Sequence, residues 1–230
     1  DDIIHKEVDP KAEILQHGIG AENGVLFSTL SSMSNRHNGR TGMGLVMASK
    51  NLKAVVVRGT KKPAIADSKA LVALNKTGPK ILPDNPDMPG LANDGTATVV
   101  AFNNTIGTLP TRNYNEGQFE DFEAISGETM SATILKERDT CYACVVRCKR
   151  VVEVKEGAYK VDPRYGGAEY ETIGTVGSYC GVNNLAAINF ANQICNEYAV
   201  DTIAAGATIA FAMECFENGI ITTADTDGIE

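Results

Sequence analysis

The sequence predicts an α+β protein in which a short β-rich part precedes a mostly helical part. The first sixty residues are rich in glycine and turns, and residues 52–59 form a β-branched run closed by a glycine. The last third contains two segments with helical periodicity. A charged linker, Thr60-Lys61-Lys62-Pro63, lies where the pattern changes. We therefore expect two parts, residues 1–60 and residues 61–230.

The elements of the first two thirds are predicted from local signals. The run 52–59 predicts a buried strand, and the proline-rich stretch 78–90 predicts a loop. Helices are expected where a polar residue can accept a hydrogen bond from the first turn. They run from Asp67 or Ser68 to about Lys76, from the turn at 93–96 to Asn103, and from Ser126 to about Arg138. The third of these helices would lead directly into the segment with the closely spaced cysteines.

The final third predicts two consecutive helices. Asn183 or Asn184 caps a helix that ends at Tyr198, with apolar residues along one stripe. Asp201 caps a second helix that runs to Phe216, and Asn218-Gly219 ends it because glycine accepts a left-handed backbone.

Composition excludes several classes of protein. The 230 residues are 43% hydrophobic and 22% charged, which is ordinary for a globular protein. A net charge of −8 argues against a nucleic-acid partner, and no apolar run is long enough for a membrane span. The start, Asp1-Asp2-Ile3, lacks a methionine and a signal region, so we expect a processed chain or an excerpt from a longer one. The six cysteines are too sparse for a disulfide scaffold, which favours a cytoplasmic location.

Three of the cysteines are closely spaced. Cys141, Cys144 and Cys148 stand at i, i+3 and i+7, so on a helix their thiols would share one face. Arg147 and its neighbouring cations would lower the thiol pKa values and offset the charge of a thiolate cluster. We predict a [4Fe–4S] cluster. Zinc is an alternative, although no second Cys or His pair follows, and thiols without metal are another. The other three, Cys180, Cys195 and Cys215, are expected to be small buried side chains.

Several short motifs follow one another in a particular order. They are Ala21-Glu22-Asn23, Gly39-Arg40-x-Gly42-x-Gly44, Ser49-Lys50-Asn51-Leu52-Lys53-Ala54, Asp94-Gly95-Thr96, Pro110-Thr111-Arg112-Asn113, the three cysteines, and Gly167-Ala168-Glu169-Tyr170-Glu171-Thr172. This succession, from about residue 18 to residue 228, resembles the aldehyde:ferredoxin oxidoreductase family of tungsten or molybdenum bis-pterin enzymes. The resemblance implies that residues 1–60 are the end of a β domain that cradles the pterin. It implies that residues 61–230 belong to a helical domain, and that the chain is an internal fragment.

The resemblance also implies cofactor contacts. The glycine loop with Arg40 and Gly42 would offer backbone N–H groups and a guanidinium to the phosphates of the cofactor, although a tight turn before a strand is the simpler alternative. Asn196 and Asp201 occupy a stretch that in the family holds a pterin ring through two acids. Asn196 replaces the first acid, and Asp201 could serve only as a helix cap. Arg147 would tune the cluster and approach the pterin.

The family's active-site glutamate maps to Glu171, where it would transfer a proton, although it could instead only stabilise a helix N-terminus. The fourth cluster ligand is expected beyond residue 230, with Cys180 as the substitute within the chain. Some family members hold a further metal between subunits through a Glu-x-x-His motif. Because that motif does not occur here, we expect no such metal.

The expected function is a segment of a tungstopterin oxidoreductase. It would oxidise small aldehydes to carboxylic acids and pass electrons through the cluster to ferredoxin or a similar carrier. The segment alone should be inactive, and a homo-oligomer or a larger redox complex is compatible with it. The alternatives are a tungsten subunit of a benzoyl-CoA-reductase type and a non-catalytic iron–sulfur module for electron transfer.

Overall fold

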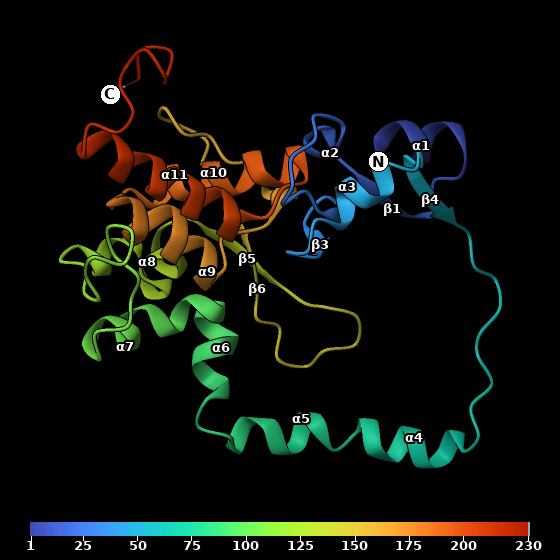
Figure 1. Ribbon diagram of the computed structural model, residues 1–230. Coiled ribbons are helices and arrows are strands. Elements are labelled where there is room, and N and C mark those ends of the chain that lie inside the picture. Colours follow the sequence, from blue (N-terminus) through green and yellow to red (C-terminus); the bar gives the residue numbers. More distant parts are fainter. Residues whose placement is uncertain (230) are drawn as a thin grey trace.

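The computed structural model describes residues 1–229, which form a sheet block and a helical block joined by a strap (Figure 1). This arrangement confirms the α+β class. The sheet is antiparallel, with the spatial order β3-β2-β1-β4. Its strands are β1 (Glu13–His17), β2 (Leu30–Ser32), β3 (Arg36–Asn38) and β4 (Ala54–Val57), accompanied by helices α1 (Asp2–Glu7), α2 (Ile19–Glu22) and α3 (Met43–Ala48).

Strand β4 corresponds to the strand expected over residues 52–59, but the expectation that it is buried is wrong. It is an edge strand that pairs only with β1, where Val56 stands opposite Ile14. The side chains of Val55, Val56 and Val57 are all exposed within the described residues. The β-branched run therefore predicted the conformation correctly, whereas burial depends on a covering layer that residues 1–229 do not supply.

The strap consists of α4 (Ser68–Asn75) and α5 (Gly78–Ile81), which run along the bottom of Figure 1. Asp67 caps α4 as predicted, because its Oδ1 accepts hydrogen bonds from the N–H groups of Lys69 and Ala70, both at 2.9 Å. The predicted loop over 78–90 is wrong. It contains α5, a 3₁₀ turn at Leu82–Asp84 and the start of α6 (Met88–Asp94), and in each a proline stands in the first turn, where its missing N–H costs nothing.

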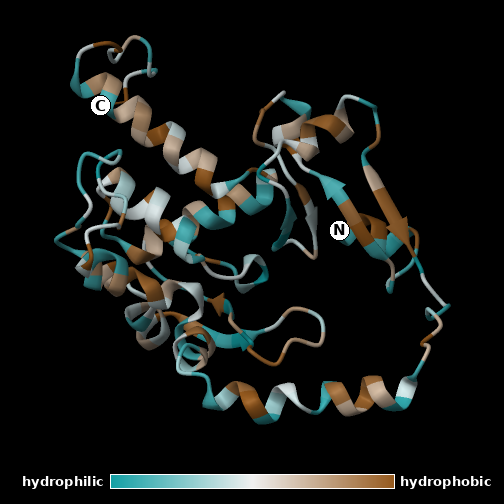
Figure 2. Cartoon of the chain, turned by 60° about the horizontal axis from the view of Figure 1, so that its bottom comes forward, coloured by the Kyte–Doolittle hydropathy of each residue, from teal (hydrophilic) through white to brown (hydrophobic). Residues whose placement is uncertain are grey.

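The helical block surrounds the main core. Its helices are α6, α7 (Val99–Thr105), α8 (Gly127–Thr133), α9 (Tyr170–Thr172), α10 (Leu185–Tyr198) and α11 (Thr202–Glu217), and α9 continues through a π turn at Ile173–Gly177. The core gathers apolar side chains from most of these elements: Val100, Leu109, Phe119, Ile125, Met130, Val152, Ile173 and Ile188. Figure 2 shows that hydrophobic residues also occur along α4, α5 and α11, outside this core. No helix among residues 1–229 is both long and apolar enough to cross a lipid bilayer.

The two C-terminal helices begin and end as predicted. Asn184 accepts a hydrogen bond from the Ala187 N–H at 3.1 Å, and Asp201 accepts one from the Ala204 N–H at 2.8 Å. After α11 the backbone turns left-handed at Gly219, with φ +68°. These caps were predictable because each is a hydrogen bond between a side chain and the backbone two or three residues away.

The helix expected from Ser126 to Arg138 is wrong in its second half. Ser126 does cap α8, but the helix ends at Thr133, and residues 135–139 form β5 (Leu135–Asp139). This strand pairs antiparallel with β6 (Lys149–Val152), and the pairing carries Val151 and Val152 into the interior. Burial of these side chains outweighs the helix preference of the Leu-Lys-Glu-Arg segment. The three cysteines therefore lie in a hairpin loop and not along a helix face.

The two blocks meet through backbone contacts. The Thr29 N–H donates to the Ala199 carbonyl at 2.7 Å, and the Asp201 N–H donates to the Phe27 carbonyl at 3.0 Å. Gly18 permits this approach, since a Cβ there would lie 2.5 Å from the Tyr198 carbonyl oxygen. The junction places the glycine loop of the sheet block against the segment between α10 and α11.

Candidate functional site

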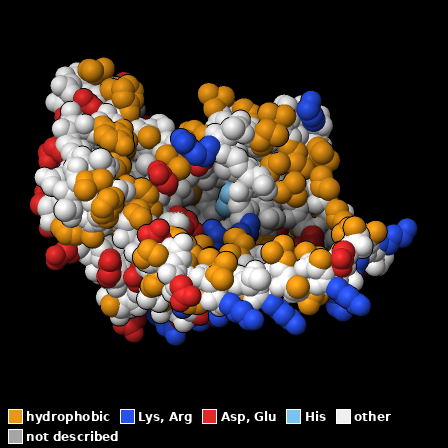
Figure 3. Space-filling model, turned by 90° about the horizontal axis from the view of Figure 1, so that it is seen from below, with side chains coloured by type: hydrophobic (Ala, Val, Ile, Leu, Met, Phe, Trp, Pro, Cys, Tyr) orange, Lys and Arg blue, Asp and Glu red, His pale blue; other side chains and the backbone are white. Residues whose placement is uncertain are grey.

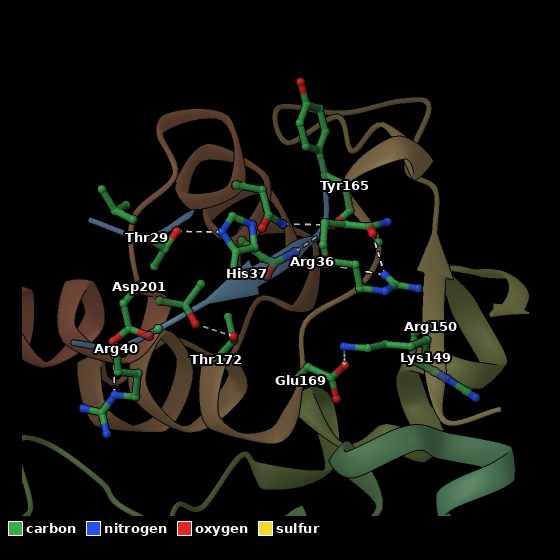
Figure 4. Close-up of a pocket in the computed structure, with 18 residues that line it drawn as sticks. Thr29, Arg36, His37, Arg40, Lys149, Arg150, Tyr165, Glu169, Thr172 and Asp201 are labelled. Carbon is green, nitrogen blue, oxygen red and sulfur yellow. Dashed lines mark hydrogen bonds and ion pairs between the residues drawn. The ribbon is translucent and has the colours of Figure 1, made fainter. Parts of the chain in front are cut away.

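A polar pocket lies at the junction of the two blocks. Its volume is about 250 Å³, and its walls come from the residue before β2, β3, the glycine loop, β6, the segment before α9, and the adjoining ends of α10 and α11. Figure 3 shows the molecule hollowed between the blocks, with a histidine and cationic side chains inside the hollow. Figure 4 draws 18 residues that line the pocket, and among the labelled ones cations and acids lie opposite one another.

Three of the residues predicted to contact a pterin line this pocket together. Arg40 Nε lies 3.3 Å from Asp201 Oδ2, in an ion pair between the glycine loop and the start of α11. Asp201 is therefore both a helix cap and a pocket residue. Asn196, in the last turn of α10, donates from Nδ2 to the Tyr165 carbonyl at 3.0 Å. The structure thus brings Arg40, Asn196 and Asp201 to one place although up to 161 positions separate them.

Gly42 and Arg147 do not line the pocket. Gly42 has φ +72°, and a Cβ there would lie 2.3 Å from the Leu26 carbonyl oxygen, so glycine is required for the loop to enter α3. The exposed Arg147 donates to the Arg138 carbonyl at 2.9 Å and so holds the loop between β5 and β6. In this structure Gly42 shapes the glycine loop that carries Arg40, and Arg147 shapes the loop that carries the three cysteines.

A second ion pair crosses the floor of the pocket. Lys149 Nζ lies 2.7 Å from Glu169 Oε1, and Thr96 donates to Glu169 Oε2 at 2.6 Å. Thr96 also accepts the Tyr170 N–H at 2.9 Å. Both oxygens of Glu169 are therefore held by hydrogen bonds, which fixes the position of its side chain.

Arg36 and His37 on β3 complete the pocket. Arg36 Nη2 lies 2.6 Å from Asp139 Oδ2 at the end of β5, so it connects the pocket wall to the cysteine loop. Burial alone would raise the pKa of Asp139. The hydrogen bonds from Arg36 and from the Thr140 backbone outweigh that effect and lower the pKa. His37 Nδ1 is hydrogen-bonded to Thr29 Oγ1 at 2.7 Å. His37 is exposed toward the pocket, but the surrounding protein desolvates its ring in part. This desolvation lowers the pKa of His37, and a hydrogen bond with Asn196 opposes the shift.

The cysteine hairpin, defined as β5, β6 and the loop 140–148, holds the three predicted cluster ligands. Cys141 and Cys144 are exposed, Cys148 is half-buried, and all three are free thiols. Within residues 1–229 no three His, Cys, Asp or Glu side chains form a set that could hold a metal ion, so the thiols share a loop without converging. The backbone turns left-handed immediately before two of them, with φ +53° at Ala143 and φ +57° at Arg147. Such turns direct N–H groups toward one side, as in loops that bind iron–sulfur clusters. In type and number these three thiols are the donors that an iron–sulfur cluster takes, although their side chains do not surround one point in this structure.

The remaining thiols differ from these three. Cys180 donates to the Thr175 carbonyl at 3.3 Å, and burial raises the pKa of both Cys180 and Cys195 to about 11. They are buried side chains, as predicted, while Cys215 is half-buried. The expectation that nearby cations lower the thiol pKa values is wrong for Cys148. Burial and the Glu169 carboxylate raise its pKa, and Lys149 opposes them only in part.

Glu171 lies outside the pocket lining, on the first turn of α9. Its side chain is exposed and makes no hydrogen bond or ion pair with any described residue. Sequence reasoning singled out Glu171 but missed the pocket roles of Arg36, His37 and the Lys149–Glu169 pair. The available signals were a cation directly before a strand histidine, in Arg36-His37, and the other acid of the Glu-Tyr-Glu block, Glu169.

A polar pocket between the sheet block and the helical block, beside a loop of three free thiols, offers the types of side chain that a redox cofactor and a cluster need. Residues 1–59 match the family model described as "Aldehyde ferredoxin oxidoreductase, N-terminal domain", and residues 73–230 match "Aldehyde ferredoxin oxidoreductase, domains 2 & 3". The chain belongs to the aldehyde ferredoxin oxidoreductase family, which confirms the resemblance of the motifs.

Individual relatives agree with this assignment. The chain is 39% identical over 224 residues to a tungsten-containing aldehyde ferredoxin oxidoreductase of Thermococcus kodakarensis, covering 95% of this chain and 36% of that protein. It is 28% identical over 234 residues to an aliphatic sulfonate oxidoreductase, WOR-like subunit, of Pyrococcus furiosus, covering 96% and 37%. A solved structure of the BamBC active-site complex of benzoyl coenzyme A reductase has a TM-score of 0.76 at 24% identity, covering 100% of this chain and 36% of that one. The chain thus spans just over a third of the length of these relatives.

The lowered pKa of His37 predicts a pH-dependent stability. Because the fold disfavours the charged ring, its contribution is present above the usual histidine pKa of about 6.5 and is lost as the pH falls through the lowered folded value. The free energy of unfolding, measured by urea denaturation between about pH 7 and pH 5, should fall more steeply for the native protein than for His37→Gln. Equal slopes in the two proteins would contradict this account of His37.

Proposed function

We propose that the full-length protein is a tungstopterin oxidoreductase that oxidises aldehydes to carboxylic acids and passes electrons through a [4Fe–4S] cluster to ferredoxin. The observation that supports this most strongly is the pocket at the block junction. It gathers Arg40, Asn196 and Asp201 next to the cysteine hairpin in a chain that matches both parts of the family. Six free cysteines support a reducing, cytoplasmic location.

The pocket residues fit a pterin cofactor with phosphate groups. Arg40 provides a guanidinium fork for phosphate oxygens, and Lys149 adds a second positive charge. Asp201 Oδ2 accepts from both Arg40 and the Ala204 N–H, whereas Oδ1 has no protein partner among residues 1–229. That free oxygen can accept a hydrogen bond from a pterin amine. A bound metallopterin would supply the two-electron redox chemistry.

Cys141, Cys144 and Cys148 would hold the cluster, with a fourth ligand from elsewhere in the full-length protein. The Arg36–Asp139 ion pair keeps the hairpin against the pocket wall, so the residues that would hold the cluster and those that would hold the cofactor belong to adjoining segments. Arg147 holds the loop backbone and adds positive charge beside the thiolates.

Glu171 and Glu169 are suited to different tasks. The two oxygens of Glu169 are occupied by Lys149 and Thr96, so this acid anchors the pocket floor. Glu171 has a carboxylate without a partner in the described residues and is therefore able to accept and release a proton. We assign proton transfer to Glu171 and a positioning role to Glu169.

Ring reduction of the benzoyl-CoA type is the second candidate. The observation that favours it is Asn196, which stands where the family motif has an acid and leaves the pocket with one carboxylate fewer. Substrate tests separate this candidate from aldehyde oxidation.

The proposed function is tested with full-length protein produced anaerobically in the presence of tungstate. We expect stoichiometric tungsten, together with iron and sulfide, and viologen reduction that depends on added aldehyde. Tungsten without turnover of any aldehyde would support ring reduction. Iron and sulfide without tungsten or molybdenum would support a non-catalytic electron-transfer module.

The cluster assignment predicts opposite outcomes for two cysteine substitutions. Cys141→Ser should abolish the electron paramagnetic resonance signal of the reduced cluster because it removes a ligand. Cys180→Ser should leave the signal in place, since Cys180 is buried and donates to the Thr175 carbonyl. A normal signal in Cys141→Ser would refute the assignment.

The two acids predict a contrast in turnover and stability. Glu171→Gln should lower aldehyde turnover by roughly 10²-fold or more, the usual contribution of a general acid–base group, with unchanged tungsten content. Glu169→Gln should instead lower the melting temperature and the cofactor content, because it weakens the pair with Lys149. If Glu169→Gln alone abolished turnover in fully loaded enzyme, the roles assigned here would be reversed.

A further inference from the structure

The strap carries a row of lysines on one side. The backbone stays right-handed helical from Ser68 to Leu82, through Lys76 and Thr77 between α4 and α5. Lys69, Lys76 and Lys80 are seven and four residues apart, which places them on one stripe of a helix. We call these three residues the lysine stripe. All three are exposed, and none takes part in an ion pair within the part of the chain that the structure describes.

The charge of the strap is opposite to that of the chain. Residues 60–80 contain five lysines and one aspartate, a net charge of +4, whereas the whole chain has a net charge of −8. Figure 3 shows Lys and Arg side chains in a row along the lower edge of the molecule, where the strap runs. A basic strip on an acidic chain is a local feature that attracts an acidic partner.

The other side of the strap is apolar. Leu71, Leu74 and Ile81 lie on the stripe roughly opposite the lysines, and all three are exposed in residues 1–229. The two stripes lie on opposite sides of the strap. A part of the full-length protein that packs against the apolar stripe therefore leaves the lysine stripe facing outward. The lysines are therefore the side of the strap that is available to a separate molecule.

The C-terminal end of the strap adjoins the cysteine hairpin. Pro79 and Leu82 line a mostly apolar groove together with Val145 and Val146 of the hairpin loop. A methyl of Val145 lies 3.9 Å from the position of a Cβ on Gly78. The lysine stripe thus ends beside the loop that carries the predicted cluster ligands.

An aromatic side chain projects from the same loop. Tyr142, between Cys141 and Cys144, is fully exposed, and Val145 is 44% exposed. Exposed aromatic residues beside apolar ones are typical anchors of protein interfaces, where charged residues surround them.

We propose that Tyr142 and the lysine stripe form the docking face for an acidic iron–sulfur protein that accepts electrons. This proposal rests on the proposed function. The lysines would steer the acidic partner, and Tyr142 would pack against it next to the predicted cluster. Oxidation of one aldehyde with one water to a carboxylic acid releases two electrons and two protons. The electrons leave one at a time, each reducing one oxidised cluster of the carrier and reoxidising the cluster of this protein.

The test uses the full-length holoenzyme and an acidic ferredoxin as the probe. The charge-reversal variant K69E/K76E/K80E is compared with K6E/K11E/K160E, which changes the net charge equally at exposed lysines on other elements. At low salt we expect the first variant to raise the KM for ferredoxin roughly tenfold or more and to flatten its salt dependence, because steering is lost. The control variant should stay within about twofold of the native protein.

Viologen-linked aldehyde oxidation separates the two proposals, because a small dye does not need the docking face. Intact viologen turnover with an unchanged KM for ferredoxin in the triple variant would overturn the docking proposal and leave the proposed function standing. Calorimetric binding of oxidised ferredoxin requires no turnover, so it tests docking even if no aldehyde is a substrate. A change of oligomeric state in the triple variant would show that the stripe contacts a second copy, which would also overturn the proposal.

Tyr142→Ala provides an independent check on the same face. We expect weaker ferredoxin binding while the electron paramagnetic resonance signal of the cluster stays unchanged. Unchanged binding in this variant would remove Tyr142 from the docking face.

Discussion

The site depends on one backbone junction between the sheet block and the helical block. Thr29 donates to Ala199, Asp201 donates to Phe27, and Ser28 pairs with Val200, so the segment that leads into β2 is joined to the short link between α10 and α11. Backbone hydrogen bonds in such a crowded place tolerate little displacement. This junction sets the distance between the glycine loop and α11, and with it the ion pair between Arg40 and Asp201.

A second set of contacts keeps the cysteine hairpin next to that junction. Arg36 reaches Asp139 from β3, and the buried Arg150 donates to the carbonyls of Ala92 and Arg147 at 3.1 and 2.8 Å. Losing the Arg150 guanidinium would remove both hydrogen bonds and with them a link between α6 and the loop of the cysteine hairpin. The pocket, the hairpin and the end of the strap thus form one connected region, in which the proposed cofactor site, the predicted cluster loop and a basic outer face follow one another. This order matches the path that electrons take in the proposed function.

Local signals predicted the helix starts well and the helix ends less well. Asp67, Ser126, Asn184 and Asp201 are all N-caps in the structure, because a cap is a contact between a side chain and the next turn of the same segment. The helix expected to reach Arg138 failed because pairing with β6, a contact across the hairpin loop, buries more apolar surface than a longer helix would. The short helices within 78–90 were missed because proline disrupts only helix interiors.

The sequence alone determined the family, the α+β class and the residue types of the site: three closely spaced thiols, an arginine in a glycine loop, and Asn196 and Asp201 around a helix boundary. These follow from patterns within short segments. Only the tertiary structure decided that Arg36, His37, Lys149 and Glu169 share the pocket with Arg40, Asn196 and Asp201. It also decided that Glu171 lies outside the pocket and that the lysines of the strap end beside the cysteine loop. The reason is physical, since these proximities arise from hydrogen bonds and ion pairs between segments that are far apart in the chain, and no local propensity encodes them.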